Sequence, residues 1–141
     1  MSKRRIAVTG VGLVTPVGIG VTESWKNIIQ GVSGISRITK FDPSNFSSQI
    51  AGEVKNFDPV NYLNPKEARR MDTFIQYGLV AGTEAIKDAG FEVNDSNAHR
   101  IGVSIGSGIG GLGTIESTND TFDAGGPGKY LPFLFQVPSL I

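Results

Sequence analysis

Apolar residues recur every three or four positions across residues 65–89, and this spacing predicts a long helix with one apolar face. At about 1.5 Å per residue, such a helix would extend roughly 37 Å. Asn64 and Pro65 suit its first turn, and Gly90 can adopt the left-handed conformation that ends a helix. Tyr77 and Val80 fall outside the apolar face, so we expect another layer or subunit to cover them. The predicted face consists of Met71, Phe74, Ile75, Gly78, Leu79, Gly82, Ala85, Ile86 and Ala89.

Two shorter apolar runs have the composition of buried strands. The first lies around residues 6–9 and the second covers residues 101–105, and glycines follow each of them. A helix is expected after each run, one capped by Thr22 and ending at Gly31, the other over residues 112–119. Residues 31–63 predict irregular structure with a short strand near 50–54. Strands that alternate with helices favour an α/β domain in which the two strands run parallel.

Composition narrows the possible classes of protein. With 141 residues, of which 39% are hydrophobic and 18% charged, the chain is long enough for one globular unit or part of a larger one. Lysine plus arginine equals aspartate plus glutamate, so no overall field favours nucleic acid or an anionic membrane. Glycines and a proline interrupt the apolar stretch after Arg5, which argues against a secretion signal or a membrane span.

The reactive residue types are few. The chain contains no cysteine, which excludes disulfides, thiolate metal sites and a cysteine nucleophile within it. A single histidine, His99, leaves the usual zinc ligand sets without members, so we expect a surface histidine and no metal site. The carboxylates of the long helix form no pair marked for acid–base chemistry; they are Glu67, Asp72, Glu84 and Asp88.

A glycine pattern follows the second predicted strand. Gly106, Gly108 and Gly111 satisfy GxGxxG before a possible helix, which is the context of a dinucleotide-binding loop. The motif also expects an acidic residue about twenty positions later, at the end of another strand, and Asp120 and Asp123 lie too close. Glycines that simply let backbones pack closely explain the pattern better.

Three cations stand at the start of the long predicted helix. Lys66, Arg69 and Arg70 are spaced three and four apart, so they share a face roughly opposite the apolar one. A solvated face is the plain explanation. Cations near a helix N-terminus oppose the helix dipole, however, and this local cost also indicates an acidic partner.

Several segments, taken in order, resemble the N-terminal part of a β-ketoacyl-acyl carrier protein synthase of the type II family of bacterial fatty acid synthesis. Ordered motifs over so much of the chain are far more specific than one glycine pattern. We expect residues 1–127 to match the family and residues 128–141, with Gly128 where a basic residue is common, to depart from it. The segments that carry the resemblance are VTGVGLVTPVG at 8–18, Trp25 with GVSGI at 31–35, RMDTFIQYG at 70–78, DAG at 88–90 and IGSGIGGLG at 105–113.

The resemblance implies part of the first half of a thiolase-like layered α/β fold, in a homodimer located in the cytoplasm. Members of the family transfer an acyl group to a cysteine, decarboxylate malonyl-carrier protein with the help of two histidines and join the two units, without a cofactor. The segments that hold the cysteine and both histidines have no counterpart in this chain. The resemblance therefore implies a fragment that is inactive alone, with no catalytic residue of its own.

The site residues that carry over are peripheral to that reaction. Ile109, with its neighbours Gly108 and Gly110, matches the position that lines and gates the acyl pocket. A basic patch that docks the acidic acyl carrier protein is matched by Lys66, Arg69, Arg70 and Lys129. Two alternatives remain at this point: a non-catalytic remnant that binds the carrier protein or dimerises, and a dinucleotide-binding α/β domain.

Overall fold

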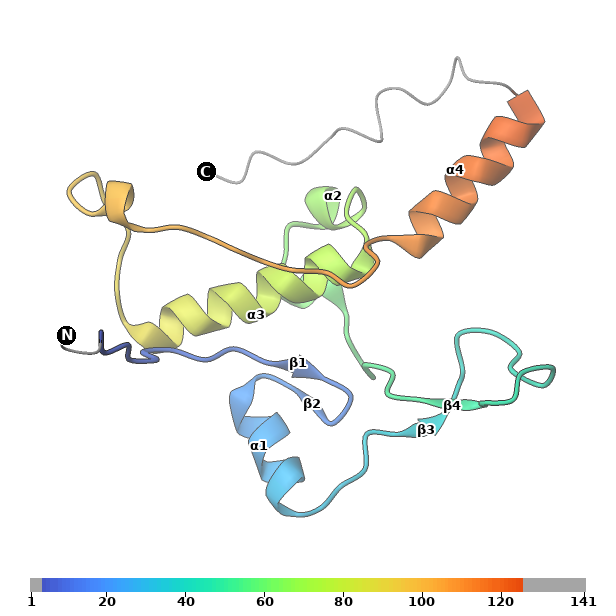
Figure 1. Cartoon of the computed structure of the whole chain (residues 1–141), viewed down its shortest axis with the longest axis horizontal. Coiled ribbons are helices and arrows are strands. Elements are labelled where there is room, and N and C mark those ends of the chain that lie inside the picture. The colour runs from blue at the N-terminus through green and yellow to red at the C-terminus, as the bar shows by residue number, and fades with distance from the viewer. Residues whose placement is uncertain (1–3, 126–141) are drawn as a thin grey trace.

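The computed structural model describes residues 4–125 and shows an open arrangement of helices and short hairpins around one central helix, α3 (Figure 1). Residues 1–3 and 126–141 lie outside the described part. Helices and strands are both present, as the sequence predicts. In chain order the elements are β1 (Val14–Thr15), β2 (Gly18–Ile19), α1 (Val21–Ile29), β3 (Ser36–Arg37), β4 (Ile50–Ala51), η1 (Pro59–Asn61), α2 (Pro65–Ala68), α3 (Thr73–Ala89), η2 (Ala98–Arg100) and α4 (Leu112–Gly125).

The long helix predicted over residues 65–89 is two helices, which corrects the prediction. The Asn64 side chain accepts a hydrogen bond from the Lys66 amide at 2.9 Å and starts α2, as expected, but α2 ends after four residues. Asp72 has extended backbone angles, φ −61° and ψ 152°, so α3 starts anew at Thr73. Gly90 ends α3 in the left-handed conformation at φ 65°, as predicted. Apolar periodicity continues across the break, which is why the pattern alone hides it.

The N-terminal segment lies along α3 through close backbone contact at two glycines. A Cβ atom at Gly10 would stand 2.8 Å from the Ala89 Cβ, and one at Gly12 would stand 2.8 Å from the Ala85 amide nitrogen. Real Cβ atoms essentially never approach so closely. Only glycine at positions 10 and 12 therefore permits this packing against Ala85 and Ala89 of α3.

The predicted pair of parallel strands is wrong for this chain. Residues 4–13 and 101–107 are extended but form no ladder with each other, and the strand pairs within residues 4–125 are β1–β2 and β3–β4, both antiparallel. Figure 1 shows the two extended segments running along opposite sides of α3. Ile105 packs against α3, with its Cγ2 atom 3.7 Å from the position of a Cβ on Gly78. Because α3 separates the segments, their backbones cannot reach the roughly 4.8 Å spacing of paired strands.

The hairpin β1–β2 leads directly into α1, with Val14 paired to Ile19 and Thr15 to Gly18. The helix begins after Gly20, at φ 89°, so Thr22 lies within the helix and does not cap it. Ser24 is fully buried, and its hydroxyl donates to the Gly18 carbonyl at 3.0 Å. This bond ties α1 to the hairpin.

The buried face of α3 differs from the predicted apolar stripe. Gln76 and Val80 are its buried residues, whereas Ile86 is 46% exposed. Tyr77 is covered from within the chain, because the Phe57 ring meets it edge-on with the ring centres 4.8 Å apart. Burial raises the pKa of the Tyr77 phenol. The expectation that another layer covers Tyr77 and Val80 is confirmed, and the segment before α2 supplies part of that layer.

The hairpin β3–β4 lies away from α3 and carries a long connecting loop (Figure 1). Phe41 and Phe46 meet edge-on in this loop, with ring centres 5.6 Å apart. The Glu53 carboxylate accepts hydrogen bonds from the Thr39 hydroxyl at 2.8 Å and the Thr39 amide at 3.1 Å, and these bonds lower the pKa of Glu53. The strand predicted near residues 50–54 is present as β4, but it covers only Ile50–Ala51.

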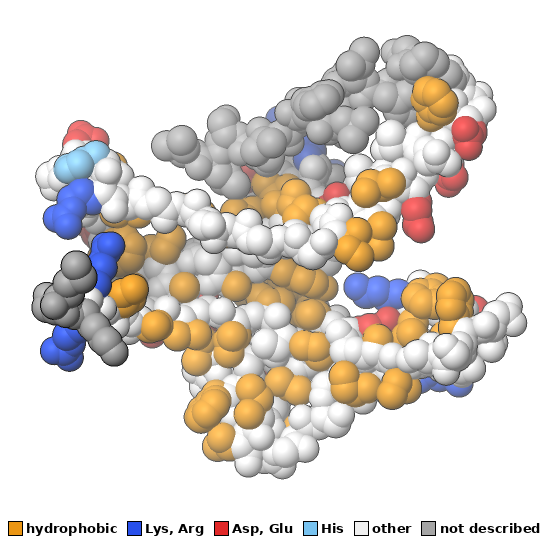
Figure 2. All heavy atoms as spheres, viewed as in Figure 1, with side chains coloured by type: hydrophobic (Ala, Val, Ile, Leu, Met, Phe, Trp, Pro, Cys, Tyr) orange, Lys and Arg blue, Asp and Glu red, His pale blue; other side chains and the backbone are white. Residues whose placement is uncertain are grey.

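Large apolar side chains remain exposed over much of the surface. Figure 2 shows them gathered along the N-terminal segment and over α1, where Trp25 is 61% and Ile29 66% exposed. Ile6 and Val103, in the two extended segments, are 88% and 82% exposed. Among the described residues, no helix is long and apolar enough to cross a membrane.

Candidate functional site

The predicted carrier-docking cations lie on α2 and on the link that follows it. Lys66 is in α2, Arg69 caps its C-terminus, and Arg70 comes next; all three are exposed. Because the long helix begins only at Thr73, these cations do not occupy its first turns, and the argument from an opposed dipole is wrong for α3. Lys129 lies outside the described residues.

A buried amide fixes the link between α2 and α3. The Gln76 side-chain nitrogen donates to the Ala68 carbonyl at 2.9 Å and to the Met71 carbonyl at 3.0 Å. Ala68 and Met71 are themselves buried. Carbonyls at the end of a helix need such partners, so Gln76 holds in one shape the segment that carries Arg69 and Arg70.

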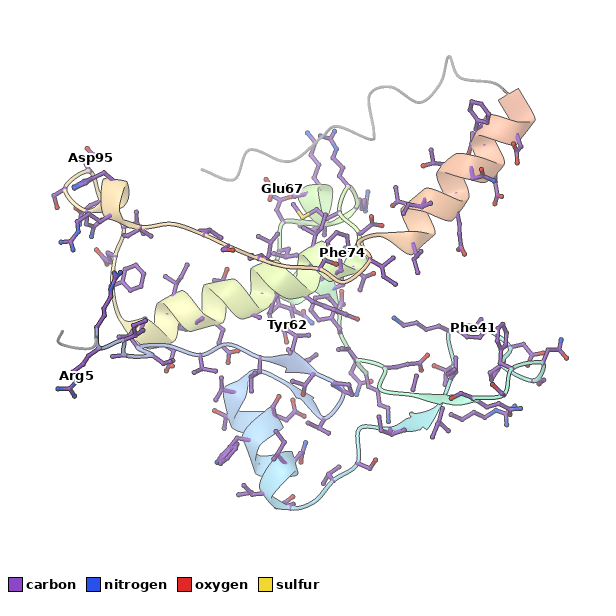
Figure 3. All side chains as sticks on the ribbon, viewed as in Figure 1. Arg5, Phe41, Tyr62, Glu67, Phe74 and Asp95 are labelled. Atoms are coloured by element: carbon purple, nitrogen blue, oxygen red, sulfur yellow. The ribbon has the colours of Figure 1, made fainter. Side chains whose placement is uncertain are left out.

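The predicted acyl-pocket loop lies near the start of α3 (Figure 1). Ile109 is 72% exposed, and Gly110 follows it with φ 81°, a conformation that favours glycine. The Ser107 hydroxyl accepts a hydrogen bond from the Gly110 amide at 3.0 Å and closes the turn. A Cβ on Gly110 would lie 4.0 Å from the edge of the Phe74 ring, and Figure 3 labels Phe74 near the start of α3.

Asp72 joins the two predicted sites. Its carboxylate accepts a hydrogen bond from the Thr114 hydroxyl at 2.5 Å, and Gly111 passes so close that a side chain there would collide with it. The candidate docking residues and the Ile109 loop therefore meet at the first residue before α3. From the sequence alone Asp72 is a helix-surface carboxylate, because Thr114 lies 42 positions away.

The same carboxylate argues against the dinucleotide alternative. A phosphate bound to a GxGxxG loop would sit at the N-terminus of the helix after it, which here is α4. Asp72 approaches Gly111 at that helix start and would repel an anion there. The glycines instead admit a close neighbour and a left-handed turn.

Two further carboxylates, those of Glu84 and Asp88, hold the N-terminal segment on α3. Glu84 accepts hydrogen bonds from the amides of Leu13 at 2.9 Å and Val21 at 2.8 Å, and Asp88 accepts one from Val11 at 2.9 Å. Glu84 thereby supplies a hydrogen-bond acceptor to the amide of the first residue of α1. This role was not predicted from the sequence, although two acids four residues apart on a mostly apolar helix could have indicated it.

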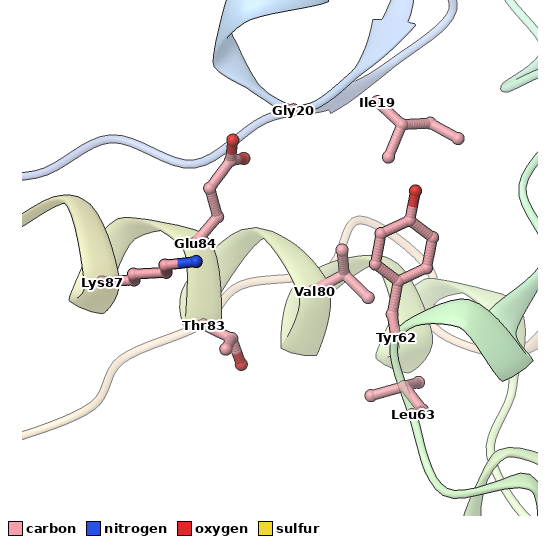
Figure 4. A pocket seen from close by; sticks show the side chains of 8 residues that line it. All are labelled: Ile19, Gly20, Tyr62, Leu63, Val80, Thr83, Glu84 and Lys87. Atoms are coloured by element: carbon pink, nitrogen blue, oxygen red, sulfur yellow. The ribbon is translucent and has the colours of Figure 1, made fainter.

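The space between α3, β2 and η1 forms an open pocket of about 360 Å³ (Figure 4). Tyr62 and Val80 face each other across one part of it, and Glu84 and Lys87 extend from α3 at the other. Glu84 is already engaged by backbone amides, which leaves no free acid–base pair here. The lining residues are Ile19, Gly20, Tyr62, Leu63, Val80, Thr83, Glu84 and Lys87.

Within residues 4–125, no group of histidine and acidic side chains is placed to hold a metal ion. His99 lies in the short helix η2 and is exposed, which confirms the surface position predicted for it.

Comparison with known proteins finds relatives that align with the whole chain. The chain is 54% identical over 141 residues to the 3-oxoacyl-[acyl-carrier-protein] synthase 2 of Vibrio cholerae, covering all of this chain and 34% of that protein. It is 46% identical over 138 residues to the enzyme of the same name from Staphylococcus aureus, covering 98% of this chain and 33% of that protein. The chain thus spans about a third of the length of these relatives.

A solved structure titled "The ishigamide ketosynthase/chain length factor" is similar in fold, with a TM-score of 0.69 and 28% sequence identity. The alignment covers 89% of this chain and 31% of that one. The family model described as "Beta-ketoacyl synthase, N-terminal domain" matches residues 3–140. The resemblance inferred from the ordered motifs is confirmed, and this chain belongs to the beta-ketoacyl synthase family.

Proposed function

We propose that this chain is the N-terminal portion of a 3-oxoacyl-acyl carrier protein synthase, which lengthens acyl chains in fatty acid synthesis. The identity of 54% over the whole chain to a synthase of that name supports the proposal. The observation that supports it most directly is the meeting of two candidate segments at the start of α3: the exposed cations that precede Asp72 and the Ile109 loop, which leads to the Thr114 hydroxyl bonded to Asp72.

In the proposed reaction, an acyl group moves from its carrier to a cysteine, and malonyl-carrier protein loses CO2. The carbanion that results attacks the acyl thioester, forms the new carbon–carbon bond and releases the thiolate. This chain contains no cysteine, so the nucleophile must come from outside these 141 residues. The chain contributes binding and positioning only.

The first contribution is docking of the acidic carrier protein on Lys66, Arg69 and Arg70. These side chains are exposed, and Gln76 fixes the backbone that carries two of them. Exposed ion pairs stabilise a complex by about 0.2–1 kcal/mol each, and salt screens them. Docking is therefore expected to be weak at high ionic strength. Lys129 is proposed as a further member of this patch.

The second contribution is part of the acyl pocket. Ile109 presents an apolar side chain that is 72% exposed in this chain and is free to line a pocket completed by other segments. Gly108 and Gly110 flank it, and the left-handed turn at Gly110 sets the direction of the loop. We propose that Ile109 contacts the acyl chain in a homodimer.

Docking is tested by measuring the affinity of the chain for acyl carrier protein by fluorescence anisotropy. Arg69→Glu and Arg70→Glu should each weaken binding about three- to fivefold at 0.15 M salt, as loss of an exposed pair implies. Lys26→Glu is the matched control, because Lys26 is an exposed cation on α1, across α3 from α2 in Figure 1. Equal losses of affinity for all three variants would show that binding depends only on the net charge of the chain, and this would refute the docking site.

Condensation is tested with acyl- and malonyl-carrier protein as substrates. The 141-residue chain alone should release no CO2 above background, and turnover by it would contradict the proposed division of roles. A non-catalytic protein that binds the carrier or dimerises is the second candidate, supported by the similarity to a ketosynthase/chain length factor structure. A coding sequence that continues past Ile141 into a Cys-Thr-x-Gly segment would decide for the enzyme.

A further inference from the structure

Asp72 occupies the position of a helix N-cap without acting as one. Aspartate is favoured there because its carboxylate can accept a hydrogen bond from an amide of the first turn, worth about 1 kcal/mol. At the start of α3 no such side-chain bond forms. The Asp72 carboxylate is turned instead to Thr114, in the first turn of α4, at 2.5 Å. A favourable local bond is given up for a contact 42 residues away.

The segment that Asp72 contacts is shaped to receive it. Gly111 passes so close to the carboxylate that any Cβ there would overlap it. The left-handed Gly110 and its bond to the Ser107 hydroxyl turn the chain just before this contact. Ile109 therefore sits in a short turn whose C-terminal end is held by Asp72.

The other side of Asp72 is connected to the cationic link. Its carbonyl accepts hydrogen bonds from the amides of Ile75 at 3.0 Å and Gln76 at 3.2 Å. Gln76 in turn holds the carbonyls of Ala68 and Met71, which flank Arg69 and Arg70. A continuous set of hydrogen bonds thus runs from the link between α2 and α3, through Asp72, to the start of α4.

We propose that Asp72 is a positioning residue that holds the Ile109 loop against the docking segment through its bond to Thr114. The partner and the acyl pocket named here rest on the proposed function, but the positioning itself does not. With the carrier protein docked on Arg69 and Arg70, a displacement of the link reaches Ile109 through this bond. Occupancy of the docking surface is then sensed at the acyl pocket.

The test removes the Thr114 hydroxyl and leaves Asp72 and the start of α3 intact. Thr114→Val should make the hydrogen-bonded amides of this turn, those of Gly110 and Ile115, exchange with solvent about tenfold faster, as loss of a hydrogen bond to a charged group implies. Thr114→Ser keeps the hydroxyl and should restore slow exchange. Thr121→Val is the control, because among residues 4–125 the Thr121 hydroxyl bonds within α4, to the Ser117 carbonyl at 2.6 Å. Unchanged exchange in Thr114→Val, or an equal effect of Thr121→Val, would overturn the proposal.

A second measurement follows the Ile109 methyl resonance during titration with acyl carrier protein. The wild-type resonance should shift on binding, and Thr114→Val should bind with the same affinity but show less than half of that shift. A full shift in Thr114→Val would overturn transmission through Asp72. Failure of the wild-type chain to bind the carrier would refute the proposed function, while the exchange rates would still decide whether Asp72 positions the loop.

Discussion

Glu84 offers a direct test of how the N-terminal segment is held on α3. Its carboxylate receives the amide of Leu13 at 2.9 Å and that of Val21 at 2.8 Å, in a partly buried position. Val21 is the first residue of α1, so Glu84 provides the acceptor that a helix start needs and that Gly20 cannot supply. Glu84→Gln keeps the shape of the side chain but removes its charge and turns one acceptor into a donor.

The size of the effect follows from these two bonds. A hydrogen bond to a charged group contributes about 1.5–3 kcal/mol, and a negative charge at a helix N-terminus adds about 0.3–1 kcal/mol. Glutamine still accepts one of the two bonds but faces the other amide with a donor. The expected loss is therefore about 2 kcal/mol, which is roughly a 30-fold change in the local opening equilibrium.

Hydrogen exchange at the Leu13 and Val21 amides measures that local opening without requiring a single global transition. Trp25, the only tryptophan in the chain, lies in α1 and reports detachment of that helix by fluorescence. Glu116→Gln on α4 is the matched control, because Glu116 is exposed, and its effect should stay within about 0.5 kcal/mol. If both amides remain as protected in Glu84→Gln as in the wild type, the carboxylate does not hold the segment.

Two further predictions concern packing and burial along α3. Gly12→Ala should detach the N-terminal segment and cost at least about 2 kcal/mol, because its methyl group would collide with Ala85; Gly82→Ala, where nothing lies within 4 Å, should gain up to about 1 kcal/mol of helix stability. Urea titrations measure the free energy of unfolding of both variants, and a change of the same sign in both would contradict the close contact at Gly12. Burial raises the pKa of Tyr77 above its ordinary value of 10.0, so the unfolded chain loses that proton first, and stability should fall as the pH rises from about 10 through the folded pKa. Tyr77→Phe should show a smaller fall between pH 9 and 11 in the same titration, and an unchanged slope would refute the assignment.

Much of the helical structure was predictable because its signals are local. Asn64 and Pro65 start α2, and Gly31 and Gly90 follow the ends of α1 and α3 with left-handed backbones. Each of these residues acts on its own turn of the chain, so the pattern needs no knowledge of the fold. The start of α1 was predicted wrongly because the Val21 amide, at the first residue of the helix, bonds to the carboxylate of Glu84, which lies 63 positions away in the sequence.

The errors share a non-local cause. The break between α2 and α3 is stabilised by Gln76, which the periodicity placed within one continuous helix. The parallel strand pair failed because α3 lies between the two extended segments, and a pattern of apolar residues does not specify which neighbour a strand meets. Residue types therefore predicted extended segments correctly but not their pairing.

The residues of the candidate site were proposed from the sequence, whereas the contacts that bring them together were not. The ordered motifs identified the family and pointed to the cations and to Ile109, and the structure places both beside the start of α3. Nothing in the sequence showed that Asp72 connects them, because that contact depends on how the chain returns from residue 101 along α3. The role of Glu84 escaped notice for the same reason.

The bonds from Glu84 and Asp88 to the N-terminal segment also bear on the order of events during synthesis. Leu13 meets its acceptor 71 residues later, and Val11 meets Asp88 after 77. At about 5–20 residues per second, a ribosome needs roughly 4–15 s to make that intervening stretch. Throughout this interval Leu13 and Val11 lack their acceptors, so the N-terminal segment can be held in place only after α3 has been synthesised.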